Sequence, residues 1–317
     1  MQNKNIVVTG GLGFIGSNIV EELINNNQIT IIDNKSSGKL ENIGQIDHEN
    51  LKIITEDLNK MTPSDLNSIL KDVDYVFHLA ALASVPRSVE NPIKSNKNNV
   101  DATVKLLTAA KDCEVSKFIF SSTSAIYGEN SNMPLKETEA MRPTSPYASS
   151  KASCELYCQS FWESYQLATV SLRYFNVFGP QQNIDSQYAS VIPNFIYHLV
   201  NNEQAVIYGD GEQTRDFVYV KDVVKANIKA CESDFIGPIN VASGKAISIN
   251  QLYEIVKNAL ESDLEPIYKK KRPGEIKHSL ADVENMENMG VNINSSLFTK
   301  QLETTIDWFK SQPIRFY

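Results

Sequence analysis

Residues 6–16 of the chain read IVVTGGLGFIG, a short β-branched run followed by closely spaced glycines. An apolar-periodic segment at 19–24 comes next, so the predicted order is strand, glycine turn and helix. Such glycines permit a tight turn and close approach of backbone N–H groups to a pyrophosphate. The stretch therefore predicts a dinucleotide-binding unit at the start of an α/β fold. The glycines fit two spacings, Gly11-x-Gly13-x-x-Gly16 and the wider Gly10-x-x-Gly13-x-x-Gly16.

A carboxylate follows the second predicted strand. Residues 29–32 form this strand, and Asp33 ends it, 20 residues beyond Gly13. At that distance an acidic side chain can bind the adenosine ribose hydroxyls. Asp33 would repel a 2′-phosphate, and Asn34 rather than an arginine follows it, so the sequence favours NAD over NADP. The competing interpretation is an ordinary βα unit closed by a glycine turn, with an aspartate at a strand end.

The composition excludes several classes of partner. The 317 residues carry a formal net charge of −8 and a pI of about 5.2, and the basic run at 269–272 resembles a solvated loop, so we expect no nucleic acid. We find no signal peptide and no stretch apolar enough to span a bilayer, so we expect no membrane partner. The four cysteines lack metal-ligand spacing. We interpret them as reduced packing residues of a cytoplasmic protein and expect no metal site.

The order of elements predicts a Rossmann-type doubly wound parallel sheet with a smaller C-terminal α/β substrate-binding subdomain. We place the dinucleotide-binding domain at 1–174, with later segments returning to it, and the substrate-binding subdomain mainly at 175–317, where proline and glycine punctuate short elements. In the first half we expect strands near 53–54 and at 75–81, 118–121 and 169–173, and a helix at 100–110. In the second half we expect helices near 192–199, 223–230, 250–260 and 297–309 and a strand at 206–208.

The carboxyl ends of parallel strands meet at one edge of a sheet, where ligands bind. His78 lies in the strand at 75–81 and is a tempting base. A histidine within a nearly continuous apolar strand is more often a satisfied core residue, so we assign it no chemistry. The strand at 118–121 brings a hydroxyl cluster, Ser121 to Ser124, to the same edge.

A tyrosine and a lysine share one face of a helix that we expect to extend to about Tyr165. Ser145 suits the cap and Pro146 the first helical position, and Tyr147 and Lys151 follow four residues apart. A phenol has a pKa of about 10, and an ammonium about 4 Å away can supply the roughly 4 kcal/mol that brings it near neutral pH. The competing interpretation is a surface lysine beside a half-buried tyrosine.

Separate motifs follow one another between residues 10 and 151: Gly10-x-x-Gly13-x-x-Gly16, Asp33-Asn34-x-Ser36-x-Gly38, Asp57-Leu58, His78-Leu79-Ala80-Ala81, Asn99, Thr123 and Tyr147-x-x-x-Lys151. Together they resemble those of the extended short-chain dehydrogenase/reductases, and within them the nucleotide-sugar 4-epimerases. The resemblance implies that NAD is bound by Gly10, Gly13, Phe14, Ile15, Gly16, Asp33, Asn34, Ser36, Gly38, Asp57, Leu58, Leu79, Ala80, Ala81, Asn99, Ser121, Tyr147, Lys151 and Tyr174.

The same resemblance implies a catalytic set. Tyr147 would be the base, Lys151 would hold the nicotinamide ribose and lower the tyrosine pKa, and Thr123 would stand where the family usually has serine. The reaction would oxidise C4 of a UDP-hexose to a transient 4-keto sugar and return hydride to the opposite face. The substrate would contact Ser84, Thr123, Ser124, Tyr147, Asn176, Gln182, Ser190, Val191, Tyr208, Arg215, Arg272 and Ser279.

Arg215 and Arg272 match positions that grip the diphosphate in the family, and guanidinium offers forked donors for that task. Tyr208, Ser190 and Val191 resemble the uridine pocket, and Tyr174 would lie by the nicotinamide. Two competing interpretations concern this half of the chain: Arg215 pairs with Asp216 on the surface, and Tyr208 belongs to the core.

The substrate choice depends on Ser279, at a position where some relatives have tyrosine. A small residue there leaves room for a 2-N-acetyl group, so we expect interconversion of UDP-GlcNAc and UDP-GalNAc, with their uronic acids as further candidates. The alternatives are UDP-glucose 4-epimerase and, from another class, an NAD(H)-sensing binding protein. A 4,6-dehydratase is disfavoured because Ser124 and Ala125, not Asp and Glu, follow Thr123. The resemblance also implies a homodimer that pairs the helix at 100–110 and the Tyr147 helix across a two-fold axis.

Overall fold

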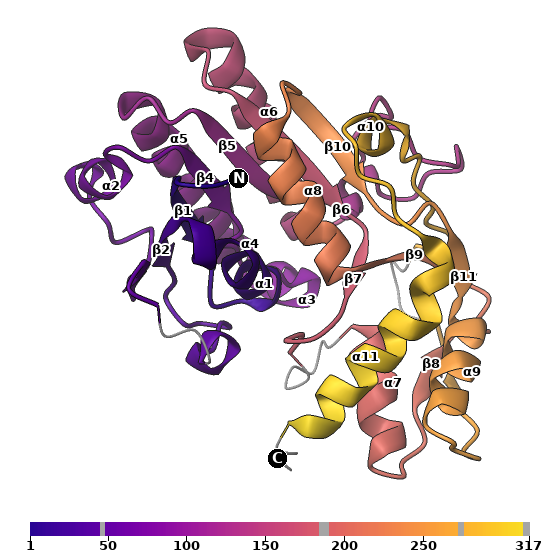
Figure 1. The fold of residues 1–317 in the computed structure, drawn as a ribbon. Coiled ribbons are helices and arrows are strands. Elements are labelled where there is room, and N and C mark those ends of the chain that lie inside the picture. The colour runs from indigo at the N-terminus through magenta and orange to yellow at the C-terminus, as the bar shows by residue number, and fades with distance from the viewer. Residues whose placement is uncertain (45–47, 184–189, 272–275, 313–317) are drawn as a thin grey trace.

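The glycine motif of the sequence joins the first strand to the first helix. In the computed structural model, β1 (Asn5–Thr9) leads through the glycine turn into α1 (Phe14–Leu23) and then β2 (Gln28–Ile32). β1 and β2 are parallel neighbours, as a βαβ unit requires. The structure describes residues 1–44, 48–183, 190–271 and 276–312 (Figure 1).

Seven strands within these described ranges form one parallel sheet in the order β10-β6-β5-β4-β1-β2-β3. The chain runs outward from β1 to β3 and then returns to place β4 on the other side of β1. Ligands of doubly wound sheets bind where the order reverses in this way, outside the carboxyl ends of the strands. The remaining strands are β3 (Leu51–Ile54), β4 (Tyr75–His78), β5 (Lys117–Thr123), β6 (Thr169–Tyr174) and β10 (Gly237–Val241).

Both faces of the sheet are buried, because neighbouring residues of a strand point to opposite sides. Ile6 and Val8 of β1 pack with the helices of one face, and Val7 packs with those of the other. The first face is covered by α1, α8 (Val220–Glu232) and α10 (Glu284–Asn288). The second face is covered by α2 (Pro63–Leu70), α5 (Ala102–Asp112) and α6 (Pro146–Tyr165) (Figure 1).

Two short helices connect β4 to α5 and pack on α6. They are α3 (Val85–Glu90) and α4 (Pro92–Asn96), and Ser84 and Asn91 cap them with side-chain oxygens. Within the described ranges, no helix is both long enough and apolar enough to cross a bilayer.

A smaller lobe follows β6. It contains the three-stranded sheet β11-β9-β7 and the pair β12-β8. Its aromatic core includes Phe178, Phe195 and Phe309. The strands are β7 (Asn176–Phe178), β8 (Val206–Tyr208), β9 (Thr214–Tyr219), β11 (Ala246–Ser248) and β12 (Ile267–Lys269), and the helices are α7 (Val191–Val200), α9 (Ile249–Ala259) and α11 (Phe298–Ser311).

The structure confirms the predicted fold class and the elements predicted in each half of the chain. One strand prediction is partly wrong: β4 ends at His78, and residues 79–81 do not extend it. The N–H of Leu79 still donates to Thr9 O at 3.1 Å, after which the chain turns beside the glycine loop. The strands β7, β9, β10, β11 and β12 and the helices α2, α3, α4 and α10 were not predicted.

His78 is a satisfied core residue, as the sequence predicts. Its side chain is 1% exposed. Its two ring nitrogens lie 2.7 Å from Thr9 Oγ1 and 2.9 Å from Thr103 Oγ1. Burial lowers its pKa to about 3, so the imidazole stays neutral.

Candidate active site

The predicted catalytic residues meet where α6 crosses the end of β5. Ser145 caps α6 by accepting the Ala148 N–H at 3.2 Å, and Pro146 takes the first helical position. Tyr147 is thereby fixed in the first turn, and its phenol lies close enough to the Thr123 hydroxyl, at the end of β5, for that hydroxyl to lower the phenol pKa. The fold brings together two residues that a long loop separates in the sequence.

Lys151 lies one turn further along the same face of α6 and is 3% exposed. Its Nζ donates to Ser121 O at 2.7 Å and lies 4.7 Å from the centre of the Phe120 ring. Burial lowers the pKa of Lys151 to about 8. The competing interpretation was a surface lysine beside a half-buried tyrosine: Tyr147 is half-buried, but Lys151 is not on the surface.

The expected ionisation of Tyr147 is corrected by the structure. Burial raises the pKa of its phenol to about 12, and the hydrogen bond from Thr123 opposes this rise only in part. The expectation that Lys151 by itself brings the phenol near neutral pH is therefore wrong. The helical spacing of the two residues did not include the loss of water around them, which is the largest cause of both pKa shifts.

Glycine is required in the loop after β1 because other backbone comes too close. Gly10 has a φ of +70°, and a Cβ there would lie 2.8 Å from Ala80 N. A Cβ on Gly16 would lie 2.2 Å from Gly10 O. The first turn of α1 carries no acidic residue and no side-chain cap, so its N–H groups are available to an anion.

Asp33 is held against this loop. Its Oδ2 accepts the Leu12 N–H at 3.1 Å and its Oδ1 accepts the Lys35 N–H at 2.8 Å. A Cβ on Gly38 would lie 2.9 Å from Asp33 Oδ2, so Gly38 also packs against the carboxylate. The neighbouring Asn34 is bonded on both sides: its amide donates to Asp57 Oδ2 at 3.3 Å, and its Oδ1 accepts the Ser36 N–H at 3.0 Å.

The remaining predicted cofactor residues line the same edge of the sheet. Phe14 and Ile15 begin α1, and Leu58 is buried after β3. Leu79, Ala80 and Ala81 follow β4, where the Ala80 N–H donates to Thr9 Oγ1 at 3.2 Å.

Two of the predicted cofactor residues have side chains turned into the protein. Asn99 lies in the π-helical turn Lys97–Asp101, accepts the Leu82 N–H at 2.7 Å and donates to Ser150 Oγ at 2.8 Å. The Tyr174 hydroxyl bonds to Asn227 Oδ1 at 2.9 Å and to Ser121.

Three predicted substrate residues line a cavity of about 210 Å³ after β6, and a fourth supports its wall. Asn176, Ser190 and Val191 line it together with phenylalanines of β7, β9 and the preceding turn. Gln182 braces the wall, because its amide donates to Ser190 Oγ at 2.8 Å and to Val177 O at 3.1 Å. Ser84 and Ser124 lie elsewhere, at the start of α3 and of the turn after β5.

Arg215 and Ser279 lie on neighbouring segments. Arg215 belongs to β9, and its Nη1 donates to Thr214 O at 2.8 Å and to Lys277 O at 3.4 Å. Ser279 is 8% exposed and follows Lys277 in the segment beside β9. Tyr208, half-buried, ends β8, and Arg272 lies outside the described residues.

The competing ion pair between Arg215 and Asp216 is not supported. Asp216 is 0% exposed. Its carboxylate accepts hydrogen bonds from Ser243, Gly244 and Ala281 at 2.7–3.2 Å.

The four cysteines are unpaired, as predicted, and Cys154, Cys158 and Cys231 are buried. In the ranges that the structure describes, no three acidic, histidine or cysteine side chains gather as metal ligands.

Residues 6–242 match the family model described as the NAD dependent epimerase/dehydratase family. The chain belongs to this family. A solved UDP-N-acetylglucosamine 4-epimerase from Methanobrevibacter ruminantium, in complex with UDP-N-acetylmuramic acid, is 59% identical with a TM-score of 0.97, over 99% of this chain and 100% of that one. The UDP-glucose 4-epimerase of Thermotoga maritima, solved with UDP-glucose, is 39% identical with a TM-score of 0.91, over 96% of this chain and 98% of that one. The UDP-glucose 4-epimerase of Thermus thermophilus, solved with NAD, is 32% identical with a TM-score of 0.86, over 97% of this chain and 99% of that one.

NAD is the cofactor of this epimerase/dehydratase chain, and the residues present fit it. The uncapped N-terminus of α1 suits a pyrophosphate, and no Cβ fits between Gly10 and Ala80. Asp33 has carboxylate lone pairs beyond its two backbone partners for ribose hydroxyls. When bound, NAD supplies a hydride acceptor and a positive charge.

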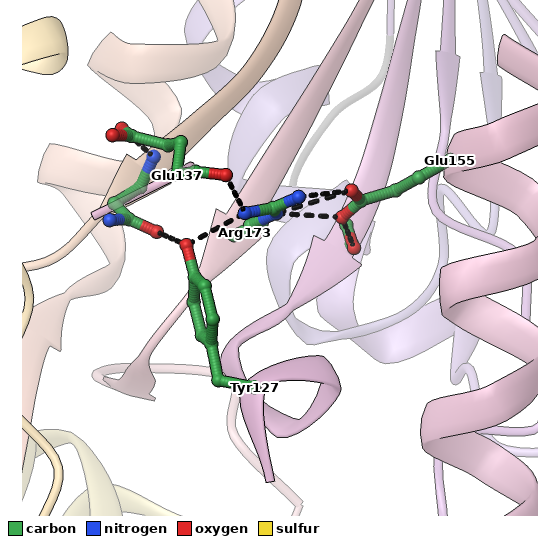
Figure 2. Close-up of polar contacts among 6 residues, drawn as sticks. Tyr127, Glu137, Glu155 and Arg173 are labelled. Carbon is green, nitrogen blue, oxygen red and sulfur yellow. Dashed lines mark hydrogen bonds and ion pairs between the residues drawn. The ribbon is translucent and has the colours of Figure 1, made fainter. Parts of the chain in front are cut away.

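A buried polar cluster beside the catalytic residues was missed by sequence reasoning. Glu155 of α6 and Arg173 of β6 form an ion pair, with Nη2 2.8 Å from Oε2, and the Arg173 guanidinium also donates to Tyr127 (Figure 2). Glu155 is four residues after Lys151, so it continues the row that Tyr147 begins. The four-residue spacing could have indicated that Glu155 faces the sheet. No local pattern indicates that its partner is Arg173, 18 residues later.

The depressed pKa of Lys151 predicts a pH dependence of stability. Its pKa is about 8 when folded, against the 10.5 of a lysine free in water. Between these pH values the unfolded chain holds a proton that the folded chain has released, so unfolding takes up a proton and stability rises with pH. Lys151→Met lacks this contribution. At pH 7 its free energy of unfolding should therefore equal that of wild type or exceed it by up to about 3 kcal/mol.

Urea unfolding of both proteins from pH 7 to 10.5 measures this. The unfolding free energy of wild type minus that of Lys151→Met should rise by up to about 3 kcal/mol as the pH rises through this window. A difference that stays constant with pH would contradict the assignment.

Proposed function

We propose that the chain catalyses NAD-dependent C4 epimerisation of a UDP-hexose through a transient 4-keto sugar. The observation that carries the proposal is the convergence of Thr123, at the end of β5, and Tyr147, one helical turn before the buried Lys151, at the cofactor edge of the sheet. A hydroxyl pair of this kind can bind a sugar hydroxyl and remove its proton.

Each catalytic residue has a separate task. Tyr147 takes the proton from the sugar 4-OH and returns it to the same oxygen after inversion. Thr123 orients that oxygen, since its hydroxyl lies near the phenol and lowers the phenol pKa. Lys151 is anchored to Ser121 O at 2.7 Å and has two further N–H donors for the nicotinamide ribose. Its charge, together with that of the bound cofactor, stabilises the phenolate that the buried site disfavours.

Epimerisation leaves no net redox change, so the cofactor must stay bound through the cycle. We assign this retention to the glycine loop, Asp33 and the residues after β4. We assign anchoring of the UDP to the lobe after residue 174, because its cavity gathers Asn176, Ser190 and Val191 and its Arg215 lies beside the Ser279 segment.

For the substrate we propose UDP-GlcNAc and UDP-GalNAc, with their uronic acids as further candidates. Ser279 is buried and small, which leaves volume for a 2-N-acetyl group. The relative at 59% identity, a UDP-N-acetylglucosamine 4-epimerase, supports the same class. UDP-glucose is the second candidate, supported by the Thermotoga and Thermus relatives. An NAD(H)-sensing protein would have no need for the Thr123–Tyr147 contact.

We also propose a cytoplasmic homodimer. Four unpaired cysteines fit a reducing compartment. The helices α5 and α6 pack together, and α6 exposes the apolar side chains of Leu156 and Tyr157, which are 58% and 42% exposed. Exposed apolar groups of this size on a long helix suit pairing with a second copy.

Replacing Tyr147 by phenylalanine should remove the base and leave the fold. We expect kcat to fall about 10²–10⁴-fold, the usual size of general base catalysis, with NAD affinity within a few-fold of wild type. Coupled assays and NAD titration measure the two quantities. Tyr165→Phe, at an exposed tyrosine of the same helix, is the matched control. Full activity of Tyr147→Phe would refute the mechanism.

Replacing Ser279 by tyrosine should change substrate selectivity. A phenol ring would fill the volume proposed for the acetyl group, so kcat/KM for UDP-GlcNAc should fall at least about 10-fold relative to UDP-glucose, a typical effect of pocket size. The measurement compares both sugars, with Ser279→Ala as the control that keeps the space. Equal losses on both sugars, or a wild type that strongly prefers UDP-glucose, would count against the acetylated substrate.

Sedimentation velocity should find a dimer of twice 35.5 kDa. Leu156→Asp should shift the species toward the monomer, because it buries a charge in an apolar contact. A wild-type monomer at micromolar concentration would reject the homodimer.

A further inference from the structure

Helix α6 presents a third polar residue in line with its catalytic pair. Tyr147, Lys151 and Glu155 follow at intervals of four and so share one face of the helix. Glu155 is 5% exposed, and its partners are the next-to-last residues of β5 and β6. Its carboxylate accepts the Nε of Arg173 at 3.1 Å and the Nη2 at 2.8 Å.

Glu155 also binds the strand that carries Thr123. The Ser122 hydroxyl donates to Glu155 Oε1, and Ser122 is the residue directly before Thr123. In the sheet, Ser122 pairs in register with Arg173, and Thr123 pairs with Tyr174. The carboxylate therefore joins α6 to β5 and β6 one residue behind the point where Thr123 meets Tyr147.

Arg173 is fixed from its other side, so it cannot follow Glu155 if the helix moves. Its Nη1 donates to the Tyr127 hydroxyl at 2.8 Å and to Glu137 O at 2.9 Å (Figure 2). Tyr127 in turn donates to Asn240 Oδ1 at 2.6 Å, and Glu137 accepts the Asn240 N–H at 2.8 Å. Since Asn240 belongs to β10, the guanidinium is locked to the sheet itself.

We propose that the Glu155–Arg173 pair is a positioning device, which sets the rotation and height of α6 so that the Tyr147 hydroxyl meets Thr123. This inference rests on the proposed function, in which Tyr147 is the base. A buried ion pair is a poor source of net stability, because desolvation offsets the attraction. It does, however, demand a fixed geometry, since a forked guanidinium binds a carboxylate in few orientations. Positioning of the phenol is a task that this geometry performs and an apolar pair does not.

The first test removes both charges together. Glu155→Leu/Arg173→Met leaves no lone buried charge and should keep its Tm within a few degrees of wild type. We expect kcat for the UDP-hexose to fall about 100-fold, as for a shift of reacting groups by about 1 Å, with KM and NAD affinity within about twofold. A double variant that keeps both its Tm and its kcat would overturn the proposal.

A milder variant decides the matter where the double variant does not fold. Ser122→Ala retains both charges and should lower kcat about 10-fold, and this loss should shrink in a Thr123→Ala background, because the two residues act on one contact. Unchanged kcat, or fully additive losses, would overturn the proposal. Tyr253→Phe is the matched control: it removes a buried hydroxyl, 2.9 Å from Leu264 O in the other lobe, and should leave kcat unchanged.

A readout without turnover separates this proposal from the proposed function. In protein labelled with 13C-tyrosine, the NMR resonance of Tyr147, assigned with Tyr147→Phe, should move in Ser122→Ala and stay in Tyr253→Phe. A wild type that converts no UDP-hexose would refute the function, whereas an unmoved Tyr147 resonance would refute the positioning.

Discussion

The hydrogen bond from the buried Lys151 ammonium to Ser121 O is the constraint on which the site depends. An ammonium 3% exposed needs acceptors, because an unpaired buried charge costs several kcal/mol. Helix α6 must therefore lie across the end of β5, where a strand-end carbonyl is available. In this position Tyr147 lies beside Thr123 and Glu155 lies beside Ser122, because Tyr147, Lys151 and Glu155 share one face of the helix.

Burial gives this site two opposing properties. It removes water from around the phenol and the ammonium, which raises the pKa of Tyr147 to about 12 and lowers that of Lys151 to about 8. The low dielectric around the buried ammonium also strengthens charge interactions there. The role proposed for Tyr147 fits these properties, because a phenol that stays protonated on its own and ionises only beside positive charge is matched to an oxidised dinucleotide.

Local signals explain what could be predicted from the sequence. Ser145 and Pro146 start α6 by their own chemistry, and the glycine turn and Asp33 are fixed by spacing within one βαβ unit. Long-range pairing explains the rest. The β10 run GPINV is short and has no local partner, since β6 lies more than 60 residues earlier. In the sequence, Glu155 belongs to a predicted helix and Arg173 to the end of a predicted strand, and no local signal pairs them. The pKa of Tyr147 depends on loss of water, which residue spacing does not reveal.

The position of β10 has a consequence for how the chain can be divided. This strand comes from residues 237–241, yet it completes the dinucleotide-binding sheet beside β6, and α8 covers Val170 and Leu172 from the same side. A fragment that stops after β6 would expose an unpaired apolar edge, which is an open template for aggregation. The two lobes therefore do not follow one another along the chain, because a segment from the second half completes the first lobe. During synthesis, the first lobe stays unfinished until most of the second has emerged from the ribosome.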